Sequence, residues 1–253
     1  MSPMAKALDR LSILSSDRIV VNSRWIADIV GKIYGTFPVV CPPGFDDEKL
    51  FPVKQKGEVT VQGLKIPKPF ILSTTRHYAQ KGLSDLIRIF SLVRNESNAK
   101  LVITGNFTNY TRALRSLCAE LGLENEVAFT GRVTEGELVK LYQNADVYAF
   151  TSPEEDFGLG PIEAMSCGTP PVVWDHAGPR ETVIDETTGL RARPNDLHNF
   201  AAKLKLLLTD TKLNAELSNN AVRHAKHNYS WSNHVKMLES ILLDAAGLDK
   251  GNR

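Results

Sequence analysis

Residues 152–168 have the sequence SPEEDFGLGPIEAMSCG, and the prediction of the fold starts from them. It follows an apolar run at 145–150 that is typical of a buried strand, and it leads into residues with helical spacing. Glu155 is therefore expected on a loop at the carboxyl end of a strand. Glu163 is expected about two turns into the next helix, so the segment brings two carboxylates to one strand-to-helix junction.

Two glycines, Gly158 and Gly160, separate these acids. Glycine lets the backbone approach a ligand, and the N–H groups at a helix start favour an anion such as a diphosphate. Carboxylates accept hydrogen bonds from sugar or ribose hydroxyls, so a nucleotide sugar would suit the segment. The competing interpretation is a helix cap at Glu155 and a solvated helix face at Glu163, which the apolar neighbours of Glu163 disfavour.

Apolar runs and helical segments alternate on both sides of this stretch. The pattern predicts an α/β fold with a doubly wound, Rossmann-like parallel sheet, in which ligands bind beyond the carboxyl ends of the strands. The expected strands are 70–74, 100–104, 126–130, 146–150 and 171–174, and the expected helices are 83–93, 111–121, 135–142 and 161–166.

The two ends of the chain lie outside this alternation. The elements expected there are helices at 3–14 and 23–34, a strand at 18–22, an apolar run at 37–41, and helices at 197–208, 212–227 and 231–246. These boundaries predict four segments: 1–45, a linker at 46–68 with a hairpin near 57–63, a nucleotide-sugar-binding domain at 69–228, and a C-terminal helix at 229–253 that packs back toward the N-terminal segment.

The composition is that of an ordinary globular protein, with 42% hydrophobic and 23% charged residues. A net charge of +1 and no Lys/Arg run exclude a general attraction to nucleic acid. No apolar stretch approaches the roughly 20 residues of a membrane span, and no secretory signal is seen. Three scattered cysteines without CxxC spacing indicate buried thiols in a reducing compartment. We expect a cytoplasmic protein that reaches the membrane only through an acceptor or partner.

A second polar group follows the first strand of the expected sheet. Arg76 and Lys81 lie on that loop, at the same sheet edge as Glu155. They could form a clamp on a diphosphate, Arg as a planar fork and Lys as a point charge, or they could be two solvated cations. Gly105 and Gly131 each come directly after a strand, as close approach of a ligand would require. Two histidines near these loops are expected to be partly exposed loop residues, His77 and His176.

Together these stretches resemble the C-terminal, donor-binding half of GT-B-fold glycosyltransferases of the retaining, family-four type, mannosyltransferases among them. The resemblance covers about residues 17–240 and includes the E-x7-E spacing of Glu155 and Glu163. The matching stretches are Arg76 with Lys81-Gly82, LVITG (101–105), VAFTG (127–131), EDFGL (155–159), EAM (163–165), GTP (168–170), AGPRET (177–182) and TGL (188–190).

The resemblance implies a role for each matched residue. Arg76 and Lys81 would bind the diphosphate and stabilise it as a leaving group, while Glu155 would contact the donor hexose. Glu163 would hold the ribose hydroxyls. The other implied donor-binding residues are Gly105, Gly131, Arg132, Val133, Asp156, Phe157, Gly158 and Leu159. The family usually needs no metal or other cofactor, and the Asp46-Asp47 pair is interpreted as a linker turn.

The implied reaction is transfer of a hexose, with mannose as the working expectation, to a glycan or lipid-linked acceptor in polysaccharide biosynthesis. Family members also carry an N-terminal Rossmann-like domain that binds the acceptor, and residues 3–36 match only its last helix and strand. We therefore expect either that the chain is a truncated product, or that it rearranges, self-associates or meets a partner chain that supplies the other wall. The strand at 18–22 is expected to be an orphan with an unpaired edge.

Three alternatives stay open. The chain could be a binding subunit that holds the nucleotide sugar and is inactive without a partner. It could use the same fold for another reaction, as an epimerase or a phosphorylase does. A nicotinamide-binding module is disfavoured, because no GxGxxG follows the first strand of the sheet. A nucleophilic role for Glu155 is disfavoured as well, because its spacing from Glu163 does not fix the carboxyl separation of retaining hydrolases.

Overall fold

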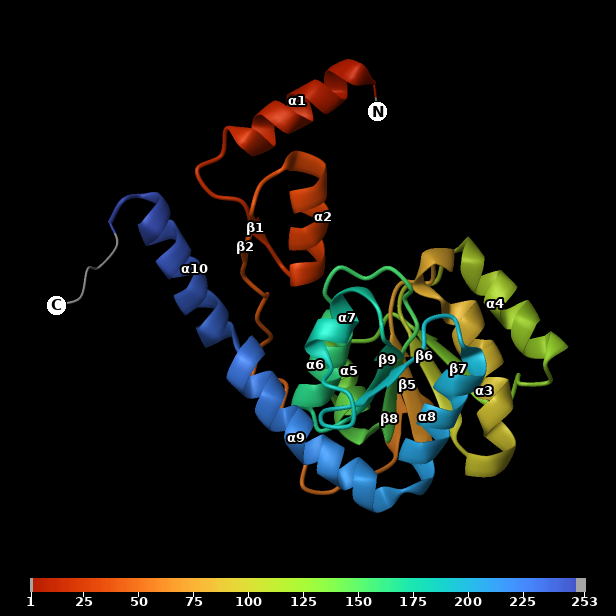
Figure 1. Ribbon diagram of the computed structural model, residues 1–253. Helices are drawn as coiled ribbons and strands as arrows, with labels where there is room; N and C mark the ends of the chain where they lie inside the picture. The colour runs from red at the N-terminus through yellow and green to blue at the C-terminus, as the bar shows by residue number, and fades with distance from the viewer. Residues whose placement is uncertain (1, 249–253) are drawn as a thin grey trace.

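The computed structural model describes residues 2–248 and confirms the α/β prediction. Its centre is a six-stranded sheet in the order β10-β9-β8-β5-β6-β7, with every neighbouring pair parallel (Figure 1). The strands are β5 (Phe70–Thr74), β6 (Lys100–Thr104), β7 (Val127–Gly131), β8 (Val147–Phe150), β9 (Pro171–Trp174) and β10 (Leu190–Ala192). Strand β10 was not predicted, because three residues carry too short an apolar pattern to be recognised.

Helices cover both faces of this sheet. One face packs on α3 (Leu83–Ser97), α4 (Asn109–Glu120) and α8 (Leu197–Thr209), and the other on α5 (Glu135–Asn144), α6 (Leu159–Ser166) and α9 (Thr211–Tyr229). The alternation within β5 shows this division, since Ile71 enters the first core and its neighbours Phe70 and Leu72 enter the second. A short helix that was not predicted, α7 (Ala177–Thr182), follows β9, and a 3-10 turn (Ala79–Lys81) follows β5.

The chain order places a topological switch in the middle of the sheet. From β5 the chain winds outward through β6 and β7, and it then returns to the other side of β5 as β8. Strand β5 therefore has both β6 and β8 as parallel neighbours. Since ligands of such sheets bind at the carboxyl ends beside the switch, the loops after β5 and β8 are the first place to look for a site.

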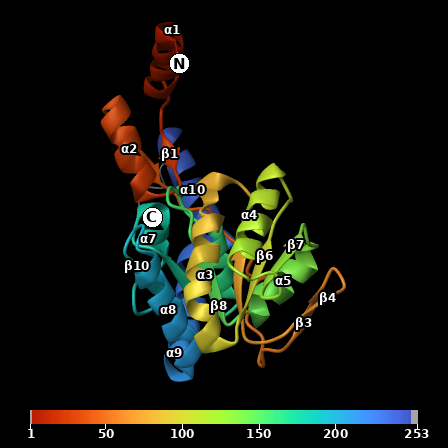
Figure 2. The same ribbon diagram turned by 90° about the vertical axis from the view of Figure 1, so that its right-hand side faces the viewer.

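The N-terminal residues form a small unit of their own at one end of the molecule (Figures 1 and 2). It contains α1 (Pro3–Leu14), β1 (Val20–Val21), α2 (Arg24–Tyr34) and β2 (Val39–Val40). The expectation of an unpaired strand at 18–22 was wrong, because β1 pairs in parallel with β2 through Val20↔Val39 and Val21↔Val40. Helix α1 buries no residue and leaves Met4, Leu8, Leu11 and Leu14 exposed.

Helix α10 (Trp231–Ala245) continues from α9 and reaches the N-terminal unit, as Figure 1 shows. Arg18 forms an ion pair with Asp244 at 2.7 Å. The backbone carbonyl of Pro42 lies 2.7 Å from Nδ1 of His234, so the connection between the two parts of the molecule also contacts α10. The C-terminal helix is thus tied to the N-terminal unit through Arg18 and to the connection through Pro42.

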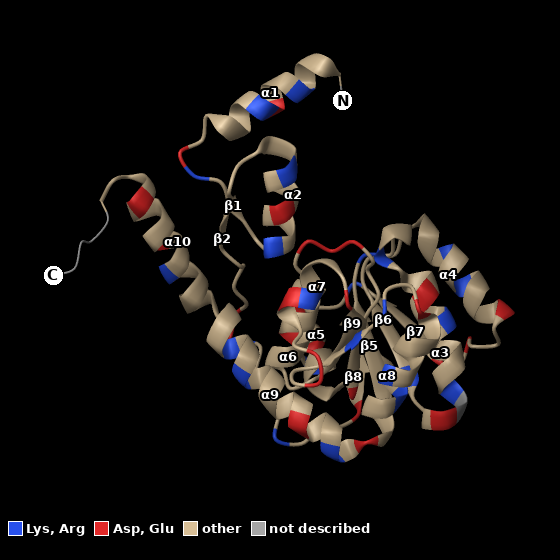
Figure 3. Ribbon diagram, viewed as in Figure 1, with Lys and Arg blue, Asp and Glu red and all other residues tan. Residues whose placement is uncertain are grey.

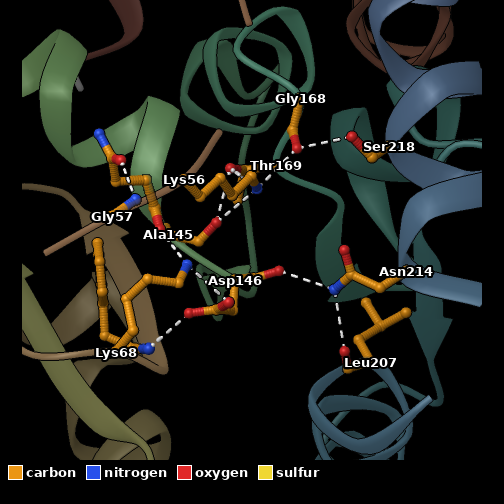
Figure 4. A network of polar contacts seen from close by, with 12 residues as sticks. Lys56, Gly57, Lys68, Ala145, Asp146, Gly168, Thr169, Leu207, Asn214 and Ser218 are labelled. Carbon is orange, nitrogen blue, oxygen red and sulfur yellow. Dashed lines mark hydrogen bonds and ion pairs between the residues drawn. The ribbon is translucent and has the colours of Figure 1, made fainter. Parts of the chain in front are cut away.

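Residues 46–68 include an antiparallel hairpin of β3 (Val59–Val61) and β4 (Leu64–Ile66), which extends past the expected limit at residue 63. Lys56 anchors this segment to the amino ends of β8 and β9 (Figure 4). Its Nζ donates to the carbonyls of Ala145 and Gly168 at 2.7 and 2.8 Å and to Oγ1 of Thr169 at 3.1 Å. Burial lowers the pKa of Lys56 to about 8, so at neutral pH it stays mostly protonated, with three donors for three acceptors.

Charges of both signs are interspersed over the helices, in keeping with the near-zero net charge (Figure 3). Cys41, Cys118 and Cys167 are buried free thiols, as predicted. No helix within residues 2–248 is long and apolar enough to cross a membrane.

Candidate functional site

The loops after β5 and β8 bring Lys81 and Glu155 together. Nζ of Lys81 lies 2.7 Å from Oε2 of Glu155, and the two side chains are only 17% and 23% exposed. The loops meet closely because residue 82 is glycine: its φ is +67°, and a Cβ there would lie 2.1 Å from the carbonyl oxygen of Thr151. The predicted cation and acid therefore form one partly buried pair at the switch point.

Arg76 lies on the same loop as Lys81, but its environment differs. Its side chain is exposed, and its guanidinium lies 5.8 Å from the ring centroid of Tyr78. Within the described part of the chain it makes no ion pair. A flat guanidinium with open N–H groups can accept a bidentate oxyanion, so Arg76 remains a donor of the kind a diphosphate requires.

Glu163 lies on α6, nearer to the start of its helix than predicted. Helix α6 begins at Leu159, two residues before the expected start, and Glu163 is its fifth residue, little more than one turn in rather than the expected two. Oε2 of Glu163 accepts a hydrogen bond of 2.7 Å from the hydroxyl of Tyr142. Burial raises the pKa of Glu163, while the hydrogen bond from Tyr142 opposes this.

The hydroxyl of Tyr142 is part of a longer chain of contacts. Oγ1 of Thr74, the last residue of β5, lies 2.7 Å from this hydroxyl and 2.8 Å from that of Tyr148. Burial raises the pKa of both tyrosines, which therefore keep their protons. The first turn of α6 closes over the chain: a Cβ at Gly160 would lie 2.2 Å from the hydroxyl oxygen of Tyr148.

The start of α6 is open. Its N-cap, Gly158, has a left-handed φ of +88°, and no side chain caps the helix. The amides of the first turn are therefore available to an anion. Leu159 is 43% exposed and could contact a ligand through its side chain. Phe157 is buried with its ring edge against Tyr229, so it could contact a ligand only through its backbone. Asp156 is exposed.

The remaining predicted donor-binding residues lie on the loops after β6 and β7. The amide of Gly105 donates to the carbonyl of Gly131 at 3.1 Å, which joins the two loops. A Cβ at Gly105 would lie 2.0 Å from the carbonyl oxygen of Thr75, so this glycine lets the loops pack together. Arg132 is exposed, and Val133 packs partly buried against the second core.

The expectation for His77 was wrong. Its side chain is fully buried between Phe107 and Phe129, and Nδ1 lies 2.9 Å from Oγ1 of Thr111. Burial and the nearby charge of Arg115 lower the pKa of His77, so it is neutral at pH 7 and packs behind the loops.

His176 is partly exposed, as expected. Its Nε2 lies 3.2 Å from Glu154, and its ring meets that of Trp25 from α2 edge-on at 4.9 Å. His176 therefore joins the loop that carries Glu155 to the N-terminal unit.

Sequence reasoning missed four polar residues around the site. The hydroxyls of Thr74, Tyr142 and Tyr148 form a chain of which Tyr142 contacts Glu163. Glu181 on α7 accepts hydrogen bonds from the backbone amides of Arg24 and Trp25 at 2.9 and 2.6 Å. The two tyrosines could have been noticed, because they stand at apolar positions of a helix and a buried strand, and a buried tyrosine hydroxyl needs a partner. Glu181 lies in the matching stretch AGPRET (177–182), but nothing in the sequence links it to the amides of α2.

This edge of the sheet combines two cations, two acids and an open helix start. The family model for glycosyl transferases group 1 matches residues 58–224, which carry all of these groups. The chain belongs to the glycosyl transferases group 1 family. Its GT-B-type relatives have the same fold, as the comparisons with solved structures show.

Relatives of this family member match nearly the whole chain. An uncharacterized glycosyltransferase of Methanocaldococcus jannaschii is 31% identical over 240 residues, covering 91% of this chain and 60% of that protein. Sucrose-phosphate synthase from Thermosynechococcus elongatus superposes with a TM-score of 0.84 at 23% identity, covering 97% of this chain and 63% of that one. HepE of Anabaena in complex with UDP and glucose gives 0.84 at 21% identity, covering 96% and 68%. This chain thus spans about 60% of the length of the curated relative.

Proposed function

We propose that this glycosyltransferase binds a nucleoside-diphosphate hexose at the carboxyl edge of its sheet and transfers the hexose to an acceptor hydroxyl with retention. The observation that carries the proposal is the convergence of Lys81, Glu155 and Glu163 from three segments beside the open start of α6. Cations and helix amides suit a diphosphate, and the two acids suit the hydroxyls on either side of it.

In this proposal, catalysis comes from charge stabilisation at the leaving group. Negative charge grows on the diphosphate as the glycosidic C–O bond breaks. Arg76, Lys81 and the first amides of α6 would hold that charge more strongly in the transition state than in the ground state. Glu155 would hold the hexose, and the acceptor oxygen would attack from the side of the departing diphosphate, which retains the configuration. The arrangement would need no metal ion, since the protein supplies the positive charge.

The proposed donor sugar and acceptor derive from one solved relative and from the family resemblance. HepE was solved with UDP and glucose, and the family resemblance includes mannosyltransferases, so a hexose is the proposed donor group, with mannose as the working choice. A glycan or lipid-linked acceptor in polysaccharide biosynthesis fits a cytoplasmic enzyme that meets the membrane through that acceptor. The described residues contain no membrane-spanning helix.

A second candidate is a donor-binding subunit that transfers only when another Rossmann-like unit completes the cleft. The N-terminal unit favours it, because α1 exposes Met4, Leu8 and Leu11 and the segment after α2 exposes Phe37 to 98%. Apolar side chains at this density suit contact with protein. The other unit would come from a partner chain, a second copy or further sequence of the same protein. Activity that appears only when such a unit is added would favour this candidate.

The test is a calorimetric titration of the purified chain with guanosine, uridine and adenosine diphosphates and with their hexose conjugates. Saturable binding of one nucleotide is expected, weakened by Lys81→Ala and by Glu163→Ala. Lys54→Ala is the matched control, because Lys54 is an exposed lysine in the linker, outside the candidate site. A folded chain that binds none of these compounds would overturn the proposal.

A further inference from the structure

Three hydroxyl groups, two of them on buried tyrosines, form a chain that ends on Glu163. The side chains of Tyr148 and Tyr142 are 0% and 1% exposed, and Oγ1 of Thr74 lies between their hydroxyls at 2.8 and 2.7 Å. The hydroxyl of Tyr142 then reaches Oε2 of Glu163 at 2.7 Å. The chain crosses from the end of β5 and from β8 through α5 to α6, so it connects four elements around the candidate site.

The carboxylate sets the direction of these hydrogen bonds. An ionised carboxylate only accepts, so the hydroxyl of Tyr142 must donate its single hydrogen to Glu163. Its oxygen can then only accept from Thr74, and Thr74 in turn can only accept from Tyr148. Every donor therefore points toward Glu163, and hydrogen bonds aligned in this way strengthen one another.

The two oxygens of Glu163 have different environments. Oε2 is held by Tyr142, whereas Oε1 accepts no hydrogen bond within residues 2–248 and is not among the buried atoms without a partner, so it reaches solvent. A carboxylate fixed through one oxygen presents the other in a defined direction. Lone pairs on that second oxygen could accept from the hydroxyls of a ribose ring.

We propose that Tyr142, supported by Thr74 and Tyr148, is a positioning residue that aims Oε1 of Glu163 at the ribose hydroxyls of the donor and so selects ribonucleotides over deoxyribonucleotides. This inference rests on the proposed function. Tyr142 touches no substrate in it and acts only through Glu163. A site built to hydrogen-bond a hydroxyl discriminates strongly against the analogue that lacks it, because its polar group is then left unpaired.

The experiment compares a ribonucleoside diphosphate that the wild-type chain binds with its 2′,3′-dideoxy counterpart, by calorimetry. We expect the wild type to prefer the ribonucleotide by about tenfold or more, since hydrogen bonds to a charged group are worth on the order of 10- to 150-fold in affinity. Tyr142→Phe removes only the hydroxyl and should reduce this preference about three- to tenfold. Tyr34→Phe is the matched control, because Tyr34 bonds to Asp9 in the N-terminal unit, and its preference should equal that of the wild type.

The outcomes distinguish a failure of this inference from a failure of the proposed function. If Tyr142→Phe weakens both nucleotides equally while Glu163→Gln removes the preference, Tyr142 has only a structural role and the positioning inference is wrong. If the wild type binds no nucleoside diphosphate, or if Glu163→Gln keeps the full preference, the proposed donor site itself is wrong. Should Tyr142→Phe not fold, Thr74→Val breaks the chain one hydroxyl further back and should give a smaller loss of preference, and an unchanged preference in that variant overturns the inference.

Discussion

Nζ of Lys81 lies 2.7 Å from Oε2 of Glu155, although the two residues are 74 positions apart in the sequence. The pair joins the loops after β5 and β8, the two strands that flank the switch point of the sheet. The proposed ligand of the diphosphate and the proposed ligand of the hexose thus fix each other's position. Because both are mostly buried, this contact is less screened by solvent than a surface ion pair.

The ion pair predicts opposite effects of its two partners on nucleoside-diphosphate binding. Lys81→Ala removes a charge-assisted contact and should weaken binding by about 1.5–3 kcal/mol, or roughly 10- to 150-fold. Glu155→Gln removes a negative charge that competes for Lys81 and repels the diphosphate, so the nucleotide should bind more tightly. The affinity for the nucleotide hexose should rise less, because the variant lacks the acid that is proposed to hold the sugar. Calorimetric dissociation constants for both ligands and both variants check this, and equal weakening by the two substitutions would contradict it.

The raised pKa of Glu163 predicts a pH-dependent cost to folding. The folded chain holds the Glu163 proton more tightly than the unfolded chain, whose carboxyl has its ordinary value of 4.5. Between 4.5 and the raised value the folded state therefore binds more protons, and the free energy of unfolding should fall as pH rises through that window. Glu163→Gln should lack this decline. Urea unfolding of both proteins between pH 4 and 7 measures the difference, and parallel pH profiles would refute the prediction.

Lys56 should be a main stabilising contact of the linker. Lys56→Met leaves two carbonyls and the hydroxyl of Thr169 without their donor and should lower the free energy of unfolding by about 1.5–3 kcal/mol. Lys54→Met changes an exposed lysine two residues away and should stay within about 0.5 kcal/mol of the wild type. Denaturant titration of the two variants is the measurement. A Lys56→Met protein as stable as its control would show that water satisfies these acceptors.

Much of the fold could be predicted because its elements have strong periodic patterns. The five strands from β5 to β9 are apolar runs separated by helices, and that alternation leaves few topologies open. Strand β10 and helix α7 are too short to carry a period, so they could not be recognised. The pairing of β1 with β2 depends on residues 19 positions apart, and nothing local specifies it.

The site was predictable only in its outline. Glycine spacing and chain order indicate that Glu155 and Lys81 share a sheet edge, but not that they contact each other. The burial of His77 depends on two aromatic rings, Phe107 on the loop after β6 and Phe129 on β7, and contacts between such distant segments leave no pattern in the sequence. The same holds for the contact between Tyr142 and Glu163, whose helices are joined through β8.

Glu181, on α7, should hold α2 against the domain that contains the six-stranded sheet. Its carboxylate accepts the amides of Arg24 and Trp25, at the positive start of that helix. Glu181→Ala removes this cap and should cost about 0.5–2 kcal/mol. Hydrogen exchange at the amides of Arg24 and Trp25 should accelerate. The control is Glu186→Ala, since Glu186 is an exposed acid shortly after α7, and this substitution should leave the exchange rates unchanged. Unchanged exchange in Glu181→Ala would mean that Ser23, the N-cap of α2, suffices alone.

The packing of α6 over the hydroxyl chain gives a final prediction with a matched pair of glycines. A Cβ at Gly160 would lie 2.2 Å from the hydroxyl oxygen of Tyr148, whereas a Cβ at Gly136, in the first turn of α5, would meet nothing within 4 Å. Gly136→Ala should therefore be neutral or stabilising by up to about 1 kcal/mol, since alanine restricts the unfolded chain.

Gly160→Ala must push α6 or Tyr148 aside, and such overpacking costs about 1–3 kcal/mol. It should also weaken nucleotide binding, because Glu163 moves with α6 away from the hydroxyl of Tyr142. Urea unfolding measures the stability of the two alanine variants, and calorimetry measures their nucleotide binding. Both substitutions replace glycine by alanine within a helix, so the gain in helix propensity is the same and any difference in stability reports the contact with Tyr148. Equal stability of the two variants would show that α6 is free to shift, and the inferred fixed position of Glu163 against Tyr142 would then be wrong.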